Sequence, residues 1–130
     1  MNNRLVKWAS GNNIIVEAQA GFRKGYCTTD QIFCLQSLVQ KYLSVQGGRL
    51  YVIFIDFSKA FDRVNHNMLW HRLISYGIHG NALKVLRSMY SQSKSCIRCK
   101  EGLTEYFNCD IGTRQGCMLS PFLFSLFINE

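Results

Sequence analysis

The run RLYVIFIDF at positions 49–57 constrains the fold of this chain more than any other segment. Between Arg49 and Asp56 every residue is aliphatic or aromatic, and five of these six are β-branched or aromatic. Such residues favour an extended strand, and a strand that is apolar on both faces is normally buried on both. We therefore predict a central strand of a sheet, with Asp56 near its carboxyl end.

The segments before and after this predicted strand have apolar residues at helical spacing. Segment 28–43 has apolar positions three and four residues apart, with Thr28 or Thr29 as the expected N-cap and Gly47-Gly48 as the stop. Segments 65–76 and 81–91 show the same spacing, so we expect two further helices there.

The last third of the chain predicts a hairpin, a loop and a helix. Segments 95–100 and 103–110 flank Glu101-Gly102 and indicate a short β-hairpin. Residues 112–116 form a polar loop bounded by glycines, and Ser120-Pro121 is expected as the N-cap and first residue of a helix still running at Glu130. Helices combined with a central strand and a hairpin predict an α+β fold, truncated inside its last helix.

The net charge and the cysteine content indicate which partners and which cellular compartment suit this chain. The 130 residues hold 15 Lys and Arg against 8 Asp and Glu, a formal charge of +7, which suits a polyanionic partner. The basic residues are dispersed, so no basic tail is indicated. Six cysteines without the apolar core of a signal peptide predict reduced thiols and an intracellular protein, in cytoplasm and nucleus.

Asp56 is the candidate functional residue that physical chemistry selects. An ionised carboxylate at the end of a buried strand is unfavourable unless it is paired or binds a metal ion. Two interpretations remain open: a Mg²⁺ ligand, or a structural N-cap or ion pair with Lys59. Asp62 is expected to point away from Asp56 and to act structurally, as a cap or a partner of Arg63. The intervening Phe61 suits core packing, or a ring placed beside a metal-bound ligand.

Three consecutive blocks carry a resemblance to a known family. QAGFRKGYCTTDQIF (19–33), FIDFSKAFDRVNH (54–66) and GTRQGCMLSPFLFSLFINE (112–130) resemble blocks of the reverse transcriptases of non-LTR (LINE-type) retrotransposons, in the family's order. LWHRLISYGI (69–78) is similar to the family's linker helix. The resemblance covers the chain from about Leu5 to Glu130.

The resemblance implies a partial right-hand polymerase, with 1–48 as a fingers portion and 49–130 as a palm portion. The implied reaction is RNA-templated DNA synthesis, in which a primer 3′-hydroxyl attacks the α-phosphate of a dNTP. Two Mg²⁺ ions roughly 4 Å apart would stabilise the attacking and leaving oxygens. Further palm, fingers and thumb segments, including the second catalytic hairpin with two more aspartates, are expected beyond this chain.

The resemblance also assigns the metal and sugar contacts. Asp56 would be a metal ligand, joined by the backbone carbonyl of Phe57. Phe61 matches the family's steric gate, a ring under the nucleotide sugar. Because one carboxylate cannot hold two Mg²⁺ ions, we expect this chain alone not to polymerise.

The remaining implied contacts are to the nucleotide and the nucleic acid. Gln115 and Gly116 correspond to residues that line the dNTP site. Arg114 beside them suits a phosphate or template contact, or equally a structural ion pair. Arg23 and Lys24 suit contacts to a nucleic-acid backbone, with solvated surface charge as the rival interpretation.

Two positions depart from the family's pattern, and two other interpretations of the chain remain. Met118 stands where the family commonly has proline, and Thr113 where it has valine. A four-thiolate zinc site (Cys96, Cys99, Cys109, Cys117) is disfavoured by the spacing of its second pair. The rival function is a non-catalytic remnant that binds nucleic acid or protein, or an untranslated relic.

Overall fold

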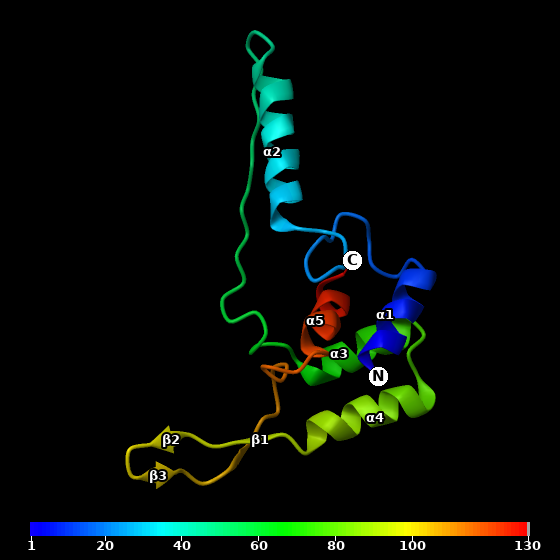
Figure 1. Cartoon of the computed structure of the whole chain (residues 1–130), viewed down its shortest axis with the longest axis vertical. Helices are drawn as coiled ribbons and strands as arrows, with labels where there is room; N and C mark the ends of the chain where they lie inside the picture. The colour runs from blue at the N-terminus through cyan, green and yellow to red at the C-terminus, as the bar shows by residue number, and fades with distance from the viewer. Residues whose placement is uncertain (130) are drawn as a thin grey trace.

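The computed structural model describes residues 1–129 (Figure 1). Its helices are α1 (Asn2–Gly11), α2 (Thr28–Leu43), α3 (His66–Ser75), α4 (Gly80–Ser91) and α5 (Ser120–Ile128), and its strands are β1 (Lys94–Ser95), β2 (Arg98–Cys99), β3 (Gly102–Leu103) and β4 (Phe107–Asn108). Helices with small antiparallel sheets give the predicted α+β arrangement, without the predicted central strand.

The core is built around α5, which is apolar on every side. Its residues Phe122 to Leu126 are all buried; α3 packs beside it, and α4 packs against α3 (Figure 1). The helices around it each contribute one apolar stripe; these are Leu5 and Ala9 of α1, Leu69, Trp70 and Leu73 of α3, and Leu83, Leu86 and Tyr90 of α4. The core therefore contains residues from both α1 and α5. It also fixes the position of the chain segments that precede and follow α3.

The helices predicted from local pattern are confirmed, with small shifts at their ends. Helix α3 begins after Asn65, whose side chain accepts a hydrogen bond of 3.1 Å from the Met68 amide. Helix α2 is capped at Cys27 rather than at Thr28 or Thr29, and the Asp30 carboxylate accepts from the Cys27 amide at 3.1 Å. In α5, Leu119 is the N-cap, so Ser120 is helical rather than capping. The predicted continuation at Glu130 lies outside the described residues.

The predicted hairpin is also confirmed, with its turn at Lys100-Glu101 rather than at Glu101-Gly102. Strands β2 and β3 pair with Cys99 opposite Gly102, and β1 pairs with β4 at its base. Gly102 has a φ of +137°, which a residue without a Cβ adopts most readily. The hairpin projects from the helical body (Figure 1).

The prediction of a buried central strand at 49–57 is wrong. The segment runs extended beside α2 but pairs with no described strand (Figure 1). Tyr51, Ile53 and Phe54 are 82%, 85% and 81% exposed. The physical reason is that a strand needs neighbours, and the four strands among residues 1–129 pair only with one another.

Helix α2 is another element with no buried residue. It stands apart from the helical body in Figure 1, and Ile32 and Phe33 are 66% and 69% exposed. Within residues 1–129, no helix combines the length and apolar character that crossing a membrane requires.

Candidate functional site

The glycine-bounded loop 112–116 is fastened to the segment that precedes α3. The Gly112 amide donates to the Val64 carbonyl at 2.8 Å, and the Thr113 amide donates to the Phe61 carbonyl at 2.8 Å. The His66 ring Nε2 lies 2.7 Å from the Gly112 carbonyl oxygen. These contacts join residues about fifty positions apart, so the loop has a fixed place on the core.

Gly112 allows this close approach. Its φ is +87°, and a Cβ built on it would lie 2.9 Å from the Asp62 carbonyl oxygen. A backbone atom cannot move aside as a flexible side chain can, so both the conformation and the contact require glycine. Gly116, at the other end of the loop, also has a positive φ of +77° but faces open space.

A side-chain hydrogen bond completes the attachment of the loop. The Gln115 amide nitrogen donates to the Asp62 carboxylate at 3.0 Å. The structural role predicted for Asp62 is therefore right in kind but wrong in partner. It neither caps a helix nor pairs with Arg63, because residues 58–63 form turns and the Asp62 side chain faces the loop.

Phe61 stands between the core and the loop. Its ring is 4.5 Å from that of Phe124 and 5.6 Å, edge to face, from that of Phe22. Aromatic pairs in this range stabilise by about 1 kcal/mol beyond burial. The ring is only half-buried. One part of it packs on α5, and another part lines a pocket formed with loop 112–116.

Four of the residues assigned to the nucleotide site line one pocket of about 460 Å³. They are Phe61, Arg114, Gln115 and Gly116. The rest of the lining comes from the loop and the start of α5, namely Thr113, Cys117, Met118, Ser120 and Pro121. The structure thus places loop 112–116 and the Phe61 ring around the same small pocket, although they lie about fifty residues apart in the sequence.

The pocket's charged side chain is held through its own backbone. The Arg114 carbonyl accepts from the Ser120 hydroxyl at 2.6 Å and from the Cys117 amide at 3.3 Å. The Arg114 residue is exposed, and the only ion pair recorded within residues 1–129 joins Arg23 to Glu17. The Arg114 guanidinium is therefore available to an anionic group at the pocket.

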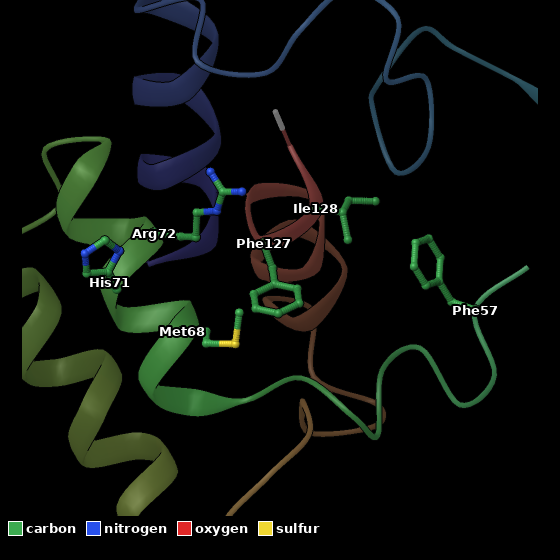
Figure 2. Close-up of a pocket in the computed structure, with 6 residues that line it drawn as sticks. All are labelled: Phe57, Met68, His71, Arg72, Phe127 and Ile128. Carbon is green, nitrogen blue, oxygen red and sulfur yellow. The ribbon is translucent and has the colours of Figure 1, made fainter. Parts of the chain in front are cut away.

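Asp56 and Phe57 lie away from this pocket. Asp56 is exposed and makes no hydrogen bond or ion pair with any described residue, so neither of its two structural alternatives, the N-cap and the ion pair with Lys59, is formed. Phe57 lines a separate groove of about 440 Å³. Figure 2 shows the Phe57 ring across this groove from Met68 of α3, with Ile128 of α5 between them.

The described residues do not fit a two-metal site. No group of three or more His, Cys, Asp or Glu side chains gathers anywhere within residues 1–129. Asp56 offers one exposed carboxylate, and Asp62 is engaged with Gln115. Metal chemistry at this site needs carboxylates that the described residues do not supply.

The two basic residues of the first block have different environments. The Arg23 guanidinium donates to the carbonyls of Val16 and Gln19 at 3.1 and 3.2 Å and stacks on the Tyr26 ring. It therefore holds the 13–26 loop together. Lys24 is exposed, and it lines the same cavity beside α1 as Arg23.

The sequence did not predict the roles of two residues that hold the loop in place. Buried Thr113 and half-buried His66 anchor the loop, although neither was assigned such a role. Their signal in the sequence is weak, because both act through backbone groups brought together by folding. Asp62 could have been found as a polar partner for the loop only by knowing that segments 61–66 and 111–115 are neighbours.

A second, polar cavity of about 430 Å³ lies on the other side of the same loop. Tyr90, Lys94 and Arg114 are among its lining residues. The Tyr90 hydroxyl is buried without a hydrogen-bond partner, and burial raises the pKa of Tyr90 above its ordinary value. Tyr90 thus stays protonated and packs edge to face on Trp70 at 5.5 Å.

Comparisons with known proteins identify the family. A family model described as reverse transcriptase (RNA-dependent DNA polymerase) matches residues 1–130. The chain is 29% identical over 129 residues to a probable RNA-directed DNA polymerase from transposon X-element of Drosophila melanogaster, covering 98% of this chain and 14% of that protein.

Two further relatives extend the comparison. An uncharacterized 149 kDa protein of transposon TX1 from Xenopus laevis is 32% identical over 100 residues, covering 77% of this chain and 8% of that protein. A retrovirus-related Pol polyprotein from the type-1 retrotransposable element R2 of Popillia japonica is 31% identical over 112 residues, covering 83% and 16%. The chain thus spans less than a fifth of the length of each. It belongs to the reverse transcriptase (RNA-dependent DNA polymerase) family, and within it to the non-LTR retrotransposon type.

Proposed function

We propose that this chain supplies the nucleotide-facing wall of an RNA-directed DNA polymerase. The reaction of the complete enzyme is attack of a primer 3′-hydroxyl on the α-phosphate of a dNTP, directed by an RNA template. The observation that carries the proposal is the pocket that Phe61 shares with Arg114, Gln115 and Gly116. A ring, a planar amide and a guanidinium around one concavity suit a ligand with a sugar, a base and phosphates.

Each side chain has a role that its chemistry supports. The half-buried Phe61 ring, held against Phe124, provides a rigid apolar wall for a deoxyribose and leaves little room for a 2′-hydroxyl. Gln115 and the open backbone at Gly116 line the path of the sugar and base. Arg114 offers planar donors that match phosphate oxygens.

Asp56 and the Phe57 carbonyl would contribute to holding Mg²⁺ in the complete enzyme. The metal ions would supply charge stabilisation at the attacking and leaving oxygens. Because no second acid joins Asp56 among the described residues, we propose that this chain does not extend primers by itself.

We further propose a division into a fingers portion, 1–48, and a palm portion, 49–130, of a right-hand polymerase. Helix α2, which stands apart from the helical body, would belong to the fingers portion. Helices α3, α4 and α5 would belong to the palm portion. RNA template and DNA primer are the proposed partners, with Arg23 and Lys24 as candidate backbone contacts; the exposure of Lys24 supports its part in this.

A nucleotide titration tests the pocket directly. We expect millimolar dNTP to shift the NMR resonances of residues 61 and 114–116 saturably, since an incomplete site binds weakly. Arg114→Ala should weaken binding about tenfold, because a charge-assisted hydrogen bond is worth about 1.5–3 kcal/mol. The matched control is Arg98→Ala, an exposed arginine of β2 outside the pocket. Shifts confined to other regions, or equal effects of the two variants, would count against the proposal.

A second candidate function is nucleic-acid binding without catalysis. The formal charge of +7 favours it, because each neutralised phosphate releases counterions. Binding to an RNA–DNA hybrid that weakens steeply with salt, together with no response to dNTP, would support this function over the first.

A further inference from the structure

The peptide unit that joins Gly112 to Thr113 is held at both of its ends. Its N–H, which belongs to Thr113, donates to the Phe61 carbonyl at 2.8 Å. Its carbonyl oxygen, which belongs to Gly112, lies 2.7 Å from the Nε2 atom of His66. A carbonyl oxygen accepts hydrogen bonds and donates none, so Nε2 of His66 carries the hydrogen. Because a peptide unit is planar, these two bonds together fix its orientation.

His66 offers this hydrogen from a well-defined position. It is the first residue of α3, directly after the Asn65 cap. Its half-buried ring packs edge to face on that of Tyr90 of α4, at 5.1 Å, and lies 6.0 Å from that of Trp70. Both of these neighbours are buried, so their rings restrict how the imidazole can turn. The packing of α3 and α4 therefore directs Nε2 toward the loop.

Gly112 is a residue at which such a restraint matters. With a φ of +87° and no Cβ, it lets the following peptide unit turn with little steric resistance. If the bond from His66 were lost, the carbonyl of this peptide would be free to turn, and the Thr113 N–H would turn with it, away from Phe61. The side chain of His66 thus maintains a backbone contact that it does not itself make.

The proposed nucleotide pocket is built on either side of this peptide unit. The Phe61 ring belongs to the residue whose carbonyl accepts from Thr113, and Arg114, Gln115 and Gly116 follow directly in the chain. The orientation of the peptide unit therefore sets how far the loop stands from the Phe61 ring.

We propose that His66 is a positioning residue that sets the sugar selectivity of the nucleotide pocket. Its Nε2–H holds the loop close to the Phe61 ring, so that a deoxyribose fits between them and a 2′-hydroxyl does not. Because the bond controls the width of the pocket, its loss changes the ratio of deoxyribonucleotide to ribonucleotide affinity. This inference rests on the proposed function, in which Phe61 faces the sugar.

Two substitutions separate the donor of His66 from its ring. His66→Gln removes the ring but keeps an N–H donor at a similar reach along the side chain. His66→Phe keeps a ring that packs on Tyr90 and Trp70 but removes the donor. If His66 acted through packing alone, His66→Phe would be the milder change, whereas the proposal predicts the opposite order. The matched control is His79→Phe, at an exposed histidine that lies outside the pocket and makes no side-chain cap for α4.

NMR titrations of the purified chain with dCTP and with CTP measure the selectivity. The unaltered chain, His66→Gln and His79→Phe should all prefer dCTP. In His66→Phe this preference should fall about three- to tenfold, the change in an equilibrium constant that one hydrogen bond typically supports. Circular dichroism shows whether each variant folds, and His66→Leu is a second donor-free variant. A preference that survives in the donor-free variants, or that falls equally in His66→Gln, overturns the proposal.

Hydrogen exchange at the Thr113 amide, measured without nucleotide, distinguishes this inference from the proposed function. Exchange should be slow in the unaltered chain and in His66→Gln, and about three- to tenfold faster in His66→Phe. Equal exchange in the two variants overturns the positioning role, whether or not a nucleotide binds. The predicted exchange pattern in a chain that binds neither nucleotide would instead overturn the proposed function, and with it the selectivity, while supporting the hold of His66 on the loop.

Discussion

The Gln115 side-chain amide reaches the Asp62 carboxylate at 3.0 Å across 53 positions of sequence. This hydrogen bond joins the loop that lines the pocket to the turn that carries Phe61. With the backbone bonds from Gly112 and Thr113, it makes two distant segments one structural unit. The geometry of the pocket therefore depends on residues that do not themselves face a ligand.

Removing the Asp62 carboxylate should loosen the loop without unfolding the chain. Asp62→Ala leaves the Gln115 amide without its acceptor on an exposed surface, so we expect a stability change of about 1 kcal/mol or less. Hydrogen exchange across residues 113–117 should become faster. Asp62→Asn keeps an oxygen acceptor and should preserve the slow exchange, and Glu101→Ala in the hairpin turn should have no effect. Equal exchange in all three variants would show that the bond does not hold the loop.

Gly112→Ala should destabilise the chain more than Gly116→Ala. Both glycines have a positive φ, for which a Cβ costs roughly 1–2 kcal/mol. Only at position 112 does the added Cβ also meet a backbone oxygen, at 2.9 Å. Urea unfolding should therefore show an extra loss of about 1–3 kcal/mol for Gly112→Ala. Equal losses at the two positions would contradict the close approach to Asp62.

A pair of large-to-small substitutions tests where the core lies. Leu123 of α5 is fully buried, whereas Ile53 is 85% exposed. Leu123→Ala should lower the free energy of unfolding by about 2–5 kcal/mol, and Ile53→Ala by less than about 0.5 kcal/mol at concentrations where the chain is monomeric. A loss of several kcal/mol for Ile53→Ala would instead place segment 49–57 in a buried sheet.

Tyr90 should make the chain sensitive to alkaline pH. Burial raises the pKa of its hydroxyl above the ordinary 10.0, so the folded state keeps a proton that the unfolded state loses. The stability associated with this group is complete below pH 10 and declines as pH rises beyond it. Tyr90→Phe should flatten this decline relative to the unaltered chain. At neutral pH it should change stability little, because the hydroxyl has no partner to leave unpaired. Parallel alkaline declines in the two proteins would rule out this role.

Local pattern predicted α2, α3, α4 and α5 but not α1, and the reason for the successes is visible in α3. Its expected range, 65–76, agrees with the structure to within one residue, because the Asn65 cap and the apolar spacing act within the segment itself. The hairpin around Lys100 and Glu101 is likewise a local structure. The strand at 49–57 failed because strand formation depends on a partner, which no amount of β propensity within the segment provides.

The resemblance assigned residues to a nucleotide site, but it did not give the contacts that hold them. The glycine-bounded loop and Phe61 were recognised from the resemblance, and the structure places them on one pocket. Sequence reasoning could not show that Asp62, His66 and Thr113 hold that loop, because these bonds join segments that only the packing of α3 on α5 brings together. It also could not show that Asp56 stays exposed, since its burial depended on the same missing strand partners.

The most direct measurement is primer extension by the purified 130-residue chain with an RNA template, a DNA primer, Mg²⁺ and dNTPs. The pocket is present here, but the described residues place no second acid with Asp56. We therefore predict no extended product above that of a protein-free control, even when nucleotide binding is detectable. Extension by the unaltered chain that disappears in Asp56→Asn would contradict this account.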